Sequence, residues 1–209
     1  MASPSTSLAD AGADPVLTKG ERTQRAILRA AIARFGRDGY RATSVADIAR
    51  DAGVGGTVPY QYFEGKEALF LAAVDEDAAG VIRRGLFEVI ANTAVEEWRR
   101  TLVFHLVEAV EHHPLARRLL SGQEPGATTR VLDIPALADL RAATAERLRA
   151  EQDLGRVRRD VDPVTMANGV IAIVMSLVMS VLQIGTDASL AYASDVAAVF
   201  DAALNPPQA

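Results

Sequence analysis

The sequence predicts an all-α protein in which a small N-terminal helical domain precedes a larger helical domain. Aromatic residues make up only 5% of the chain, whereas alanine and leucine, which lose little freedom in a helix, are plentiful. Apolar residues recur with helical spacing through most of the 209 residues. No stretch alternates apolar and polar residues as a half-buried strand does, and the sequence has no internal repeat.

Composition narrows the class of protein further. A hydrophobic content of 49% is enough to bury the core of one large or two small domains. The absence of cysteine excludes disulfides, thiolate metal sites and cysteine nucleophiles, and it fits a reducing compartment. Residues 1–17 lack the positive start and apolar stretch of a signal peptide. We therefore expect a disordered tail there and a cytoplasmic protein.

Charge is distributed unevenly along the chain. Residues 18–66 carry nine Lys or Arg against five Asp or Glu, whereas residues 67–209 carry 13 against 20. A basic N-terminal third on an acidic body indicates a polyanionic partner at that end, although a surplus of this size over about fifty residues also arises by chance. We divide the chain into a tail (1–17), a basic domain (18–66) and a helical body (67–209).

A first amphipathic helix is predicted in residues 22–40, "RTQRAILRAAIARFGRDGY". Its arginines fall on one face, and its other face is apolar. The apolar residues are Ile27, Ala30, Ala31, Ile32 and Phe35. Gly36 and the pair formed by Asp38 and Gly39 are expected to end the helix.

A second helix follows, with Thr43 or Ser44 as its N-cap. Ser44 and Asp47 have the spacing of a rough capping box. The inner face of this helix consists of Val45, Ile48 and Ala49. Gly53 is expected to end it.

A third, short helix is predicted around "TVPYQYF", residues 57–63. Thr57 is a suitable N-cap, and Pro59 is tolerated as the second helical residue because an N–H there has no partner within the helix. Gly65 then separates this helix from a longer one that begins at Lys66 and runs to residue 91.

The body is predicted to consist of further helices. The segment at 95–113 stops before Pro114 and is followed by a short helix at 115–122. Residues 123–135 read as a loop, and residues 136–152 as an amphipathic helix. A long apolar helix at 163–185 and a last helix at 189–204 complete the fold.

The second and third helices have the spacing of a helix-turn-helix. Gly53 lies four residues after Ala49, which must be small because the following helix crosses over it. Gly53 suits a turn that needs a positive φ, and Ile48 and Val54 are expected to pack the pair together. In this arrangement the following helix presents its outer face to the major groove of DNA.

Residues 22–70 resemble the DNA-binding region of the TetR family of transcriptional regulators. The shared features are a first helix ending in Phe35, then Gly39 and Tyr40, a threonine cap, "DIARDAGV", "YQYF" and "KEAL". The resemblance covers about the first third of the chain, and the rest agrees only in helical character and length. It implies an N-terminal three-helix DNA-binding domain followed by a larger helical ligand-binding and dimerisation domain.

The resemblance also implies a function. It points to a homodimeric regulator, more commonly a repressor than an activator, that binds a palindromic operator in double-stranded DNA. An apolar or amphipathic small molecule bound in the body would release it. No cofactor is implied.

The resemblance assigns roles to particular residues. Tyr60 and Tyr62 match a pair that reaches phosphates, although Tyr62 equally suits the core, as Phe63 does. Lys66 matches a lysine that meets the DNA backbone with its charge and its helix dipole, and Thr43 matches a cap that touches a phosphate. The full predicted DNA-binding set is Thr43, Ser44, Val45, Ala46, Gly55, Gly56, Thr57, Tyr60, Gln61, Tyr62 and Lys66.

One departure from the family pattern lies in residues 55–59. Pro59 stands where the family usually has an aliphatic residue, and Gly55, Gly56 and Thr57 precede it. The alternative is that "GTV" is shifted by one position and the proline is inserted. With so few side chains to read bases, recognition depends on backbone fit and DNA shape as well as on direct contacts.

Residues 164–186 contain no charge and are long enough to span a membrane, which takes about 20 residues. However, Asn168, Ala172, Ser176 and Ser180 recur every four residues and form a small stripe that permits close helix approach. Together with the last helix, two copies would form a four-helix dimer interface. We favour the dimer, with a membrane span as the alternative. The predicted interface residues are Ala172, Ser176, Met179, Ser180, Gln183, Val196, Val199 and Phe200.

The aromatic and histidine residues of the body supply the remaining candidates. Those proposed to line a ligand pocket are Phe87, Trp98, Phe104 and His105. His105, Glu108 and His112 share a helix face with metal-ligand spacing, but histidines at a helix end also suit the dipole, and we predict no metal site. The sequence lacks the nucleophile-elbow, Walker and zinc-protease motifs, so we expect no enzyme activity.

Overall fold

The computed structural model describes residues 17–124, 126, 133–185 and 193–205. All regular elements within these residues are helical, which confirms the predicted fold class. The predicted tail before residue 17, most of the loop predicted at 123–135 and the start of the last predicted helix lie outside the described residues.

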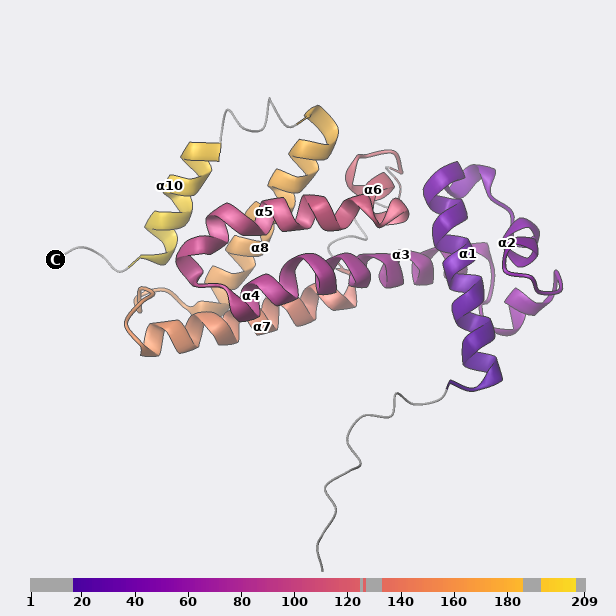
Figure 1. Ribbon diagram of the computed structural model, residues 1–209, viewed down its shortest axis with the longest axis horizontal. Helices are drawn as coiled ribbons and strands as arrows, with labels where there is room; N and C mark the ends of the chain where they lie inside the picture. The colour runs from indigo at the N-terminus through magenta and orange to yellow at the C-terminus, as the bar shows by residue number, and fades with distance from the viewer. Residues whose placement is uncertain (1–16, 125, 127–132, 186–192, 206–209) are drawn as a thin grey trace, which may run out of the picture.

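The N-terminal domain consists of α1 (Lys19–Ala42), α2 (Val45–Asp51) and the 3₁₀ turn η1 (Val58–Gln61). It stands at one end of the molecule, and α3 (Lys66–Ile82) runs from it into the body (Figure 1). The boundary that we place between residues 66 and 67 stays a prediction. A single continuous helix begins there and belongs to both parts.

The body contains the π turn η2 (Arg83–Phe87), α4 (Glu88–Asn92), α5 (Val95–Glu111) and α6 (Pro114–Leu120). These are followed by α7 (Pro135–Asp153), α8 (Pro163–Ile184) and α10 (Ala193–Leu204). Helix α8 packs against α5, α6 and α7, while α10 packs on α5 at the end far from the N-terminal domain (Figure 1).

The first helix begins earlier than predicted. Thr18 is its N-cap, and its Oγ1 accepts from the N–H of Glu21 while the Glu21 carboxylate accepts from the N–H of Thr18. This reciprocal pair is a capping box, whose Thr-x-x-Glu spacing is visible in the sequence. The helix therefore starts at Lys19 instead of Arg22.

The expectation that Gly36 ends the first helix is wrong. The helix continues through Gly36, where an added Cβ would lie 2.7 Å from the Pro114 Cβ, so this glycine permits close contact with α6. The chain direction changes at Gly39, whose φ of +82° lies in the region that favours glycine. Ser44, rather than Thr43, is the N-cap of α2 and accepts from the N–H of Asp47.

The third helix is shorter and tighter than predicted. Thr57 occupies the N-cap position, but its φ of −91° and ψ of −13° are helical, and its side chain caps nothing. The carbonyl of Pro59 instead accepts from the N–H groups of both Tyr62 and Phe63. The result is a single 3₁₀ turn that holds this segment compactly against α2.

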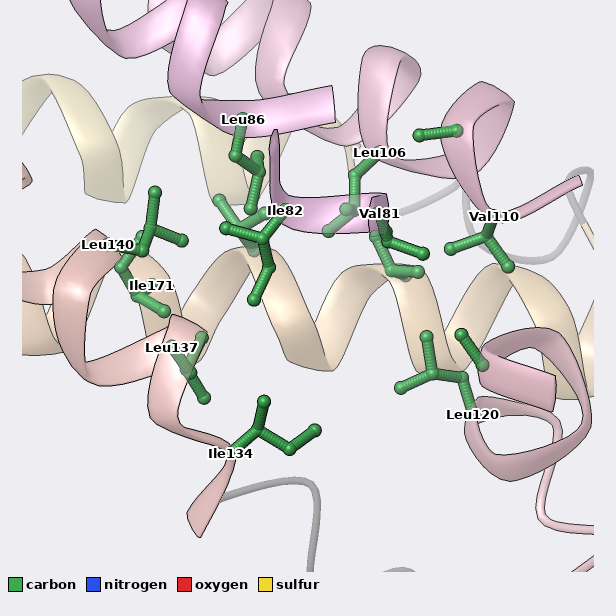
Figure 2. Close-up of a cluster of buried hydrophobic side chains, with 14 of the residues drawn as sticks. Val81, Ile82, Leu86, Leu106, Val110, Leu120, Ile134, Leu137, Leu140 and Ile171 are labelled. Carbon is green, nitrogen blue, oxygen red and sulfur yellow. The ribbon is translucent and has the colours of Figure 1, made fainter. Parts of the chain in front are cut away.

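The core of the body is largely aliphatic and continuous. Figure 2 shows Val81, Ile82 and Leu86 meeting side chains of α5, α7 and α8. Gly85 lies where α5 approaches closely, since an added Cβ would be 2.9 Å from the Ala109 Cβ. The predicted helix at 66–91 is interrupted here by the π turn η2, which the sequence pattern did not indicate.

Helix α8 is long and apolar enough to cross a membrane, but one third of its most apolar window is buried within the protein. Its inward face packs into the core, and its other face is open. The buried residues are Met166, Ala167, Val170, Ile171, Val174 and Val178.

Candidate nucleic-acid interface

The helix-turn-helix has the predicted packing. Ala49 is 1% exposed beneath the following segment, and Ile48 is fully buried. The N–H of Val54 donates to the carbonyl of Ala49 at 3.0 Å, which closes the turn. Gly53 has a φ of +69°, so the positive φ inferred from its position in the sequence is confirmed.

Ion pairs fix α2 to α1. Arg34 donates to Asp51 through two parallel bonds, Nε to Oδ2 at 2.6 Å and Nη2 to Oδ1 at 2.9 Å. Asp47 accepts from the Ser44 hydroxyl at 2.6 Å and from Arg50 at 2.9 Å. The bond from Arg34 lowers the pKa of Asp51, and the bonds from Ser44 and then Arg50 lower the pKa of Asp47. These charges therefore serve first to hold the domain together.

The turn and the 3₁₀ segment form an uncharged, exposed tip. Gly55, Gly56, Thr57 and Gln61 are exposed, and Tyr60 is 57% exposed. No charged residue occurs between positions 52 and 63. The surface offered by this tip consists of backbone, a threonine, a glutamine amide and a phenol.

Pro59 is buried immediately before exposed Tyr60. It occupies the inward position that an aliphatic residue would fill. This placement fits the first of the two alternatives, in which proline substitutes for the aliphatic residue and nothing is inserted.

Lys66 is the first residue of α3, next to the tip. Its ammonium lies 4.5 Å from the centre of the Tyr40 ring and 3.4 Å from the carbonyl oxygen of Arg41. The first backbone N–H groups of a helix have no partner within the helix and carry a partial positive charge. The charge of Lys66 thus adds to that of the helix end.

Two predicted contact residues lie behind the surface instead of on it. Thr43 is 2% exposed, and its hydroxyl donates to the Gly39 carbonyl at 2.8 Å, where it supports the kink in α1. Val45 is 7% exposed and belongs to the core. Tyr62 is half-buried against the core, with its hydroxyl near Gly20, and Phe63 packs there too, as predicted. The predicted residues at the surface are Ser44, Ala46, Gly55, Gly56, Thr57, Tyr60, Gln61 and Lys66.

The four residues predicted to line a ligand pocket differ widely in exposure, and none of them lines the apolar cavity described below. Trp98 is fully buried, Phe104 is 66% exposed, Phe87 is 37% exposed and His105 is half-buried. They lie on different faces of α5 and η2, and aromatic character alone did not distinguish inward from outward positions.

An apolar cavity of about 40 Å³ lies elsewhere in the body, between α3, α5, α6, α7 and α8. Figure 2 shows part of its surroundings, including Val81, Leu106 and Leu120. Its lining is apolar throughout. Residues of this kind fill most core positions, so the sequence held no signal for it. Among the lining residues are Ala78, Ala116, Leu119, Leu120, Ile134 and Met175.

The histidines serve local structure. His105 lies 3.8 Å from Glu108, and His112 is the exposed C-cap of α5. His113 is the N-cap of α6 and pairs with buried Asp77 at 2.8 Å. Within the described residues no group of three potential metal ligands converges.

The predicted interface residues differ in exposure: all but Phe200 are exposed or half-buried. On α8, Ala172, Ser176 and Gln183 are exposed, while Met179 and Ser180 are half-buried. On α10, Val199 is 56% exposed and Val196 is half-buried. Phe200, at 3% exposure, belongs to the core of its own chain, so its placement at an interface is wrong.

Residues 27–73 match the family described as "Bacterial regulatory proteins, tetR family". The HTH-type transcriptional repressor AcnR of Corynebacterium diphtheriae is 30% identical over 179 residues, which cover 83% of this chain and 88% of that protein.

Solved structures share the fold. A TetR-family regulator from Mesorhizobium loti has a TM-score of 0.68 at 22% identity and covers 90% of this chain and 100% of its own. FadR from Bacillus subtilis, in complex with stearoyl-CoA, has a TM-score of 0.61 at 16% identity and covers 84% of this chain and 96% of its own.

Proposed function

Because the chain belongs to the TetR family of transcriptional regulators, which are not enzymes, we propose that it is a ligand-responsive repressor acting in the cytoplasm. It binds a palindromic operator as a homodimer, and a small apolar or amphipathic molecule in the body releases it. The observation that carries this proposal is the exposed tip at residues 55–61, backed by a buried helix-turn-helix core and flanked by Lys66.

The geometry of the tip supports DNA binding through two kinds of contact. Tyr60 and Lys66 supply a hydroxyl and a charge suited to phosphates, which position the protein on the duplex. Thr57 and Gln61 supply polar groups suited to base edges in the major groove. A single helix-turn-helix contacts only one half-site, so a dimer is needed to read a palindrome.

The open face of α8 supports dimerisation. Ala172 and Ser176 are exposed on a helix of mean hydropathy 2.0, and the Ser176 hydroxyl donates to the Ala172 carbonyl at 2.8 Å. That hydroxyl therefore does not need water to satisfy it. Gly169 lies on the exposed side, and an added Cβ there would meet nothing within 4 Å. A glycine within a helix costs about 1 kcal/mol relative to alanine, so its presence supports close approach by a second copy.

The cavity supports an apolar effector. At about 40 Å³ it is far smaller than the roughly 300–1,000 Å³ of a typical ligand site, so an effector must enlarge it. The walls that could separate include Ala116, Leu119 and Leu120 of α6. The stearoyl-CoA held by the Bacillus subtilis relative is an amphipathic molecule with a long apolar chain, which agrees with an apolar lining.

Helix α6 connects this cavity with the DNA-binding domain. Its inward residues line the cavity, while Pro114 at its start contacts Gly36 of α1. Arg118 binds Glu124, which in turn accepts from the N–H of Tyr40. An effector that favours a displaced α6 therefore shifts the protein toward a state in which the two helix-turn-helix units no longer fit the operator.

The experiment that tests the proposal is selection of bound duplexes from a random pool, followed by a screen of apolar small molecules for release. We expect enrichment of a palindrome whose affinity falls linearly with salt on logarithmic axes. Failure to enrich any duplex, or an affinity insensitive to salt, would remove the DNA-binding role. If the protein binds a selected operator but no compound releases it, the proposed effector is contradicted.

A further inference from the structure

We infer that residues 55–61 read A·T base pairs, with a thymine methyl group seated on the backbone of Gly55 and Gly56. This inference rests on the DNA-binding role proposed above and names the bases that the tip recognises.

The two glycines are not required by the fold. Neither has a positive φ, unlike Gly53 in the same turn. An added Cβ at Gly56 would meet nothing within 4 Å, and one at Gly55 would lie 3.6 Å from the Val58 Cγ2, an ordinary contact. Alanine at such positions usually stabilises a protein by restricting its unfolded chain. Since the fold does not require these two glycines, we attribute them to a partner that contacts the exposed backbone there.

The composition of the tip disfavours recognition of guanine. Arg or Lys paired with guanine O6 and N7 is the commonest specific contact in the major groove. No charged residue occurs between positions 52 and 63. Of the arginines in the adjoining helices, Arg34 of α1 and Arg50 of α2 are engaged by Asp51 and Asp47 respectively.

The groups that remain suit an A·T pair. Gln61 is exposed, its amide makes no hydrogen bond within the described part of the chain, and glutamine pairs through two bonds with adenine N6 and N7. Thr57 offers a methyl group and a hydroxyl. The thymine C5-methyl is the apolar group in the groove that such surfaces contact. A backbone without Cβ atoms lets this methyl come closest at Gly55 and Gly56.

The test combines one change in the DNA with one in the protein. Deoxyuridine replaces thymine in the selected operator, which removes only the C5-methyl, and Gly56→Ala adds only a Cβ. We expect the deoxyuridine operator to bind the wild-type protein several-fold more weakly than the thymine operator does. We expect Gly56→Ala to bind the thymine operator about tenfold more weakly than the wild type does. Gly56→Ala should lose most of the preference for thymine over uridine, and its thermal stability should equal or exceed that of the wild type.

The matched control is Gly126→Ala, since Gly126 also has open space around it and no positive φ. It should leave both affinities unchanged. Equal wild-type affinity for thymine and uridine duplexes, or a selected operator with G·C pairs at the centre of each half-site, would overturn the inference. The inference would also be overturned if Gly56→Ala lowered the affinity for operator and unrelated duplexes equally. That result would mean that the glycines contact the phosphate backbone and not the bases. A wild-type protein that binds no duplex contradicts the proposed function itself instead.

Discussion

The carboxylate of Glu124 accepts a hydrogen bond from the backbone N–H of Tyr40 at 3.0 Å, across 84 residues of sequence. The same oxygen accepts from Arg118 Nε at 2.9 Å. Gly39 makes this approach possible, because an added Cβ would lie 2.6 Å from both the Glu124 carboxylate and the Arg118 guanidinium. These contacts join the end of α1 to the chain that follows α6. They fix the direction in which the DNA-binding domain leaves the body.

Glu124→Ala is expected to loosen this connection. It leaves the Tyr40 N–H and the partly buried Arg118 without their acceptor, which should cost about 1–3 kcal/mol of unfolding free energy. The local readout is hydrogen exchange of the Tyr40 amide, which should become much faster. Gln123→Ala changes the exposed neighbouring side chain and should affect neither quantity. A Tyr40 amide that stays protected in Glu124→Ala would show that another group holds the two parts together.

Tyr60→Phe and Lys66→Ala are expected to weaken binding to operator and unrelated duplexes by similar factors. Phosphate contacts carry no sequence information, so their loss lowers both affinities, and removal of one cationic contact should reduce the salt slope by about one. Titrations of both duplexes at several salt concentrations measure this. Unchanged affinity for both duplexes would remove these two residues from the interface.

Ser176→Asp is expected to dissociate the dimer. It places a charge in the middle of the open apolar face of α8, where burial without a partner is costly. Light scattering coupled to size exclusion gives the mass directly. Ala142→Asp, on an exposed position of α7, is the control and should stay dimeric. A Ser176→Asp protein that remains dimeric would move the interface to another surface.

Acid is expected to loosen the DNA-binding domain through Asp51 and Asp47. Their pKa values lie below the usual 3.8 because they accept hydrogen bonds, Asp51 from Arg34 and Asp47 from Ser44 and Arg50. The unfolded chain therefore binds these protons more readily, and the stabilisation present at neutral pH is lost as the pH falls below that value.

Thermal unfolding of the wild type and Asp51→Asn, at neutral pH and at about pH 3, tests this effect. At neutral pH the wild type should have a higher melting temperature than Asp51→Asn. The difference between the two melting temperatures should become smaller at about pH 3. A gap that stays constant would mean that the Arg34 and Asp51 pair does not contribute to the pH dependence.

Local features of this protein could be predicted from the sequence, and contacts between distant residues could not. The helix-turn-helix followed from Ala49, Gly53 and the apolar spacing around them, all within a few residues. The pairing of Glu124 with Tyr40 depends on how α6 meets α1, for which no local pattern exists. The same holds for the cavity, because its apolar lining resembles the rest of the core.

The errors have similar physical causes. Gly36 is a residue type typical of helix ends, but here it allows Pro114 to approach α1 closely across the domain boundary. Phe200 is one of the predicted interface residues of the last helix, but it packs into its own chain. In both cases tertiary packing decided the role of the residue.

The measurement that tests the central claim most directly is binding to a series of duplexes in which the two half-sites are moved apart one base pair at a time. Two copies of the tip carried by one dimer predict maximal affinity at a centre-to-centre spacing near a whole number of turns, about 10 base pairs each. They also predict a sharp loss when half a turn is added, which places the second site on the opposite side of the duplex. An affinity that does not depend on spacing would contradict the account.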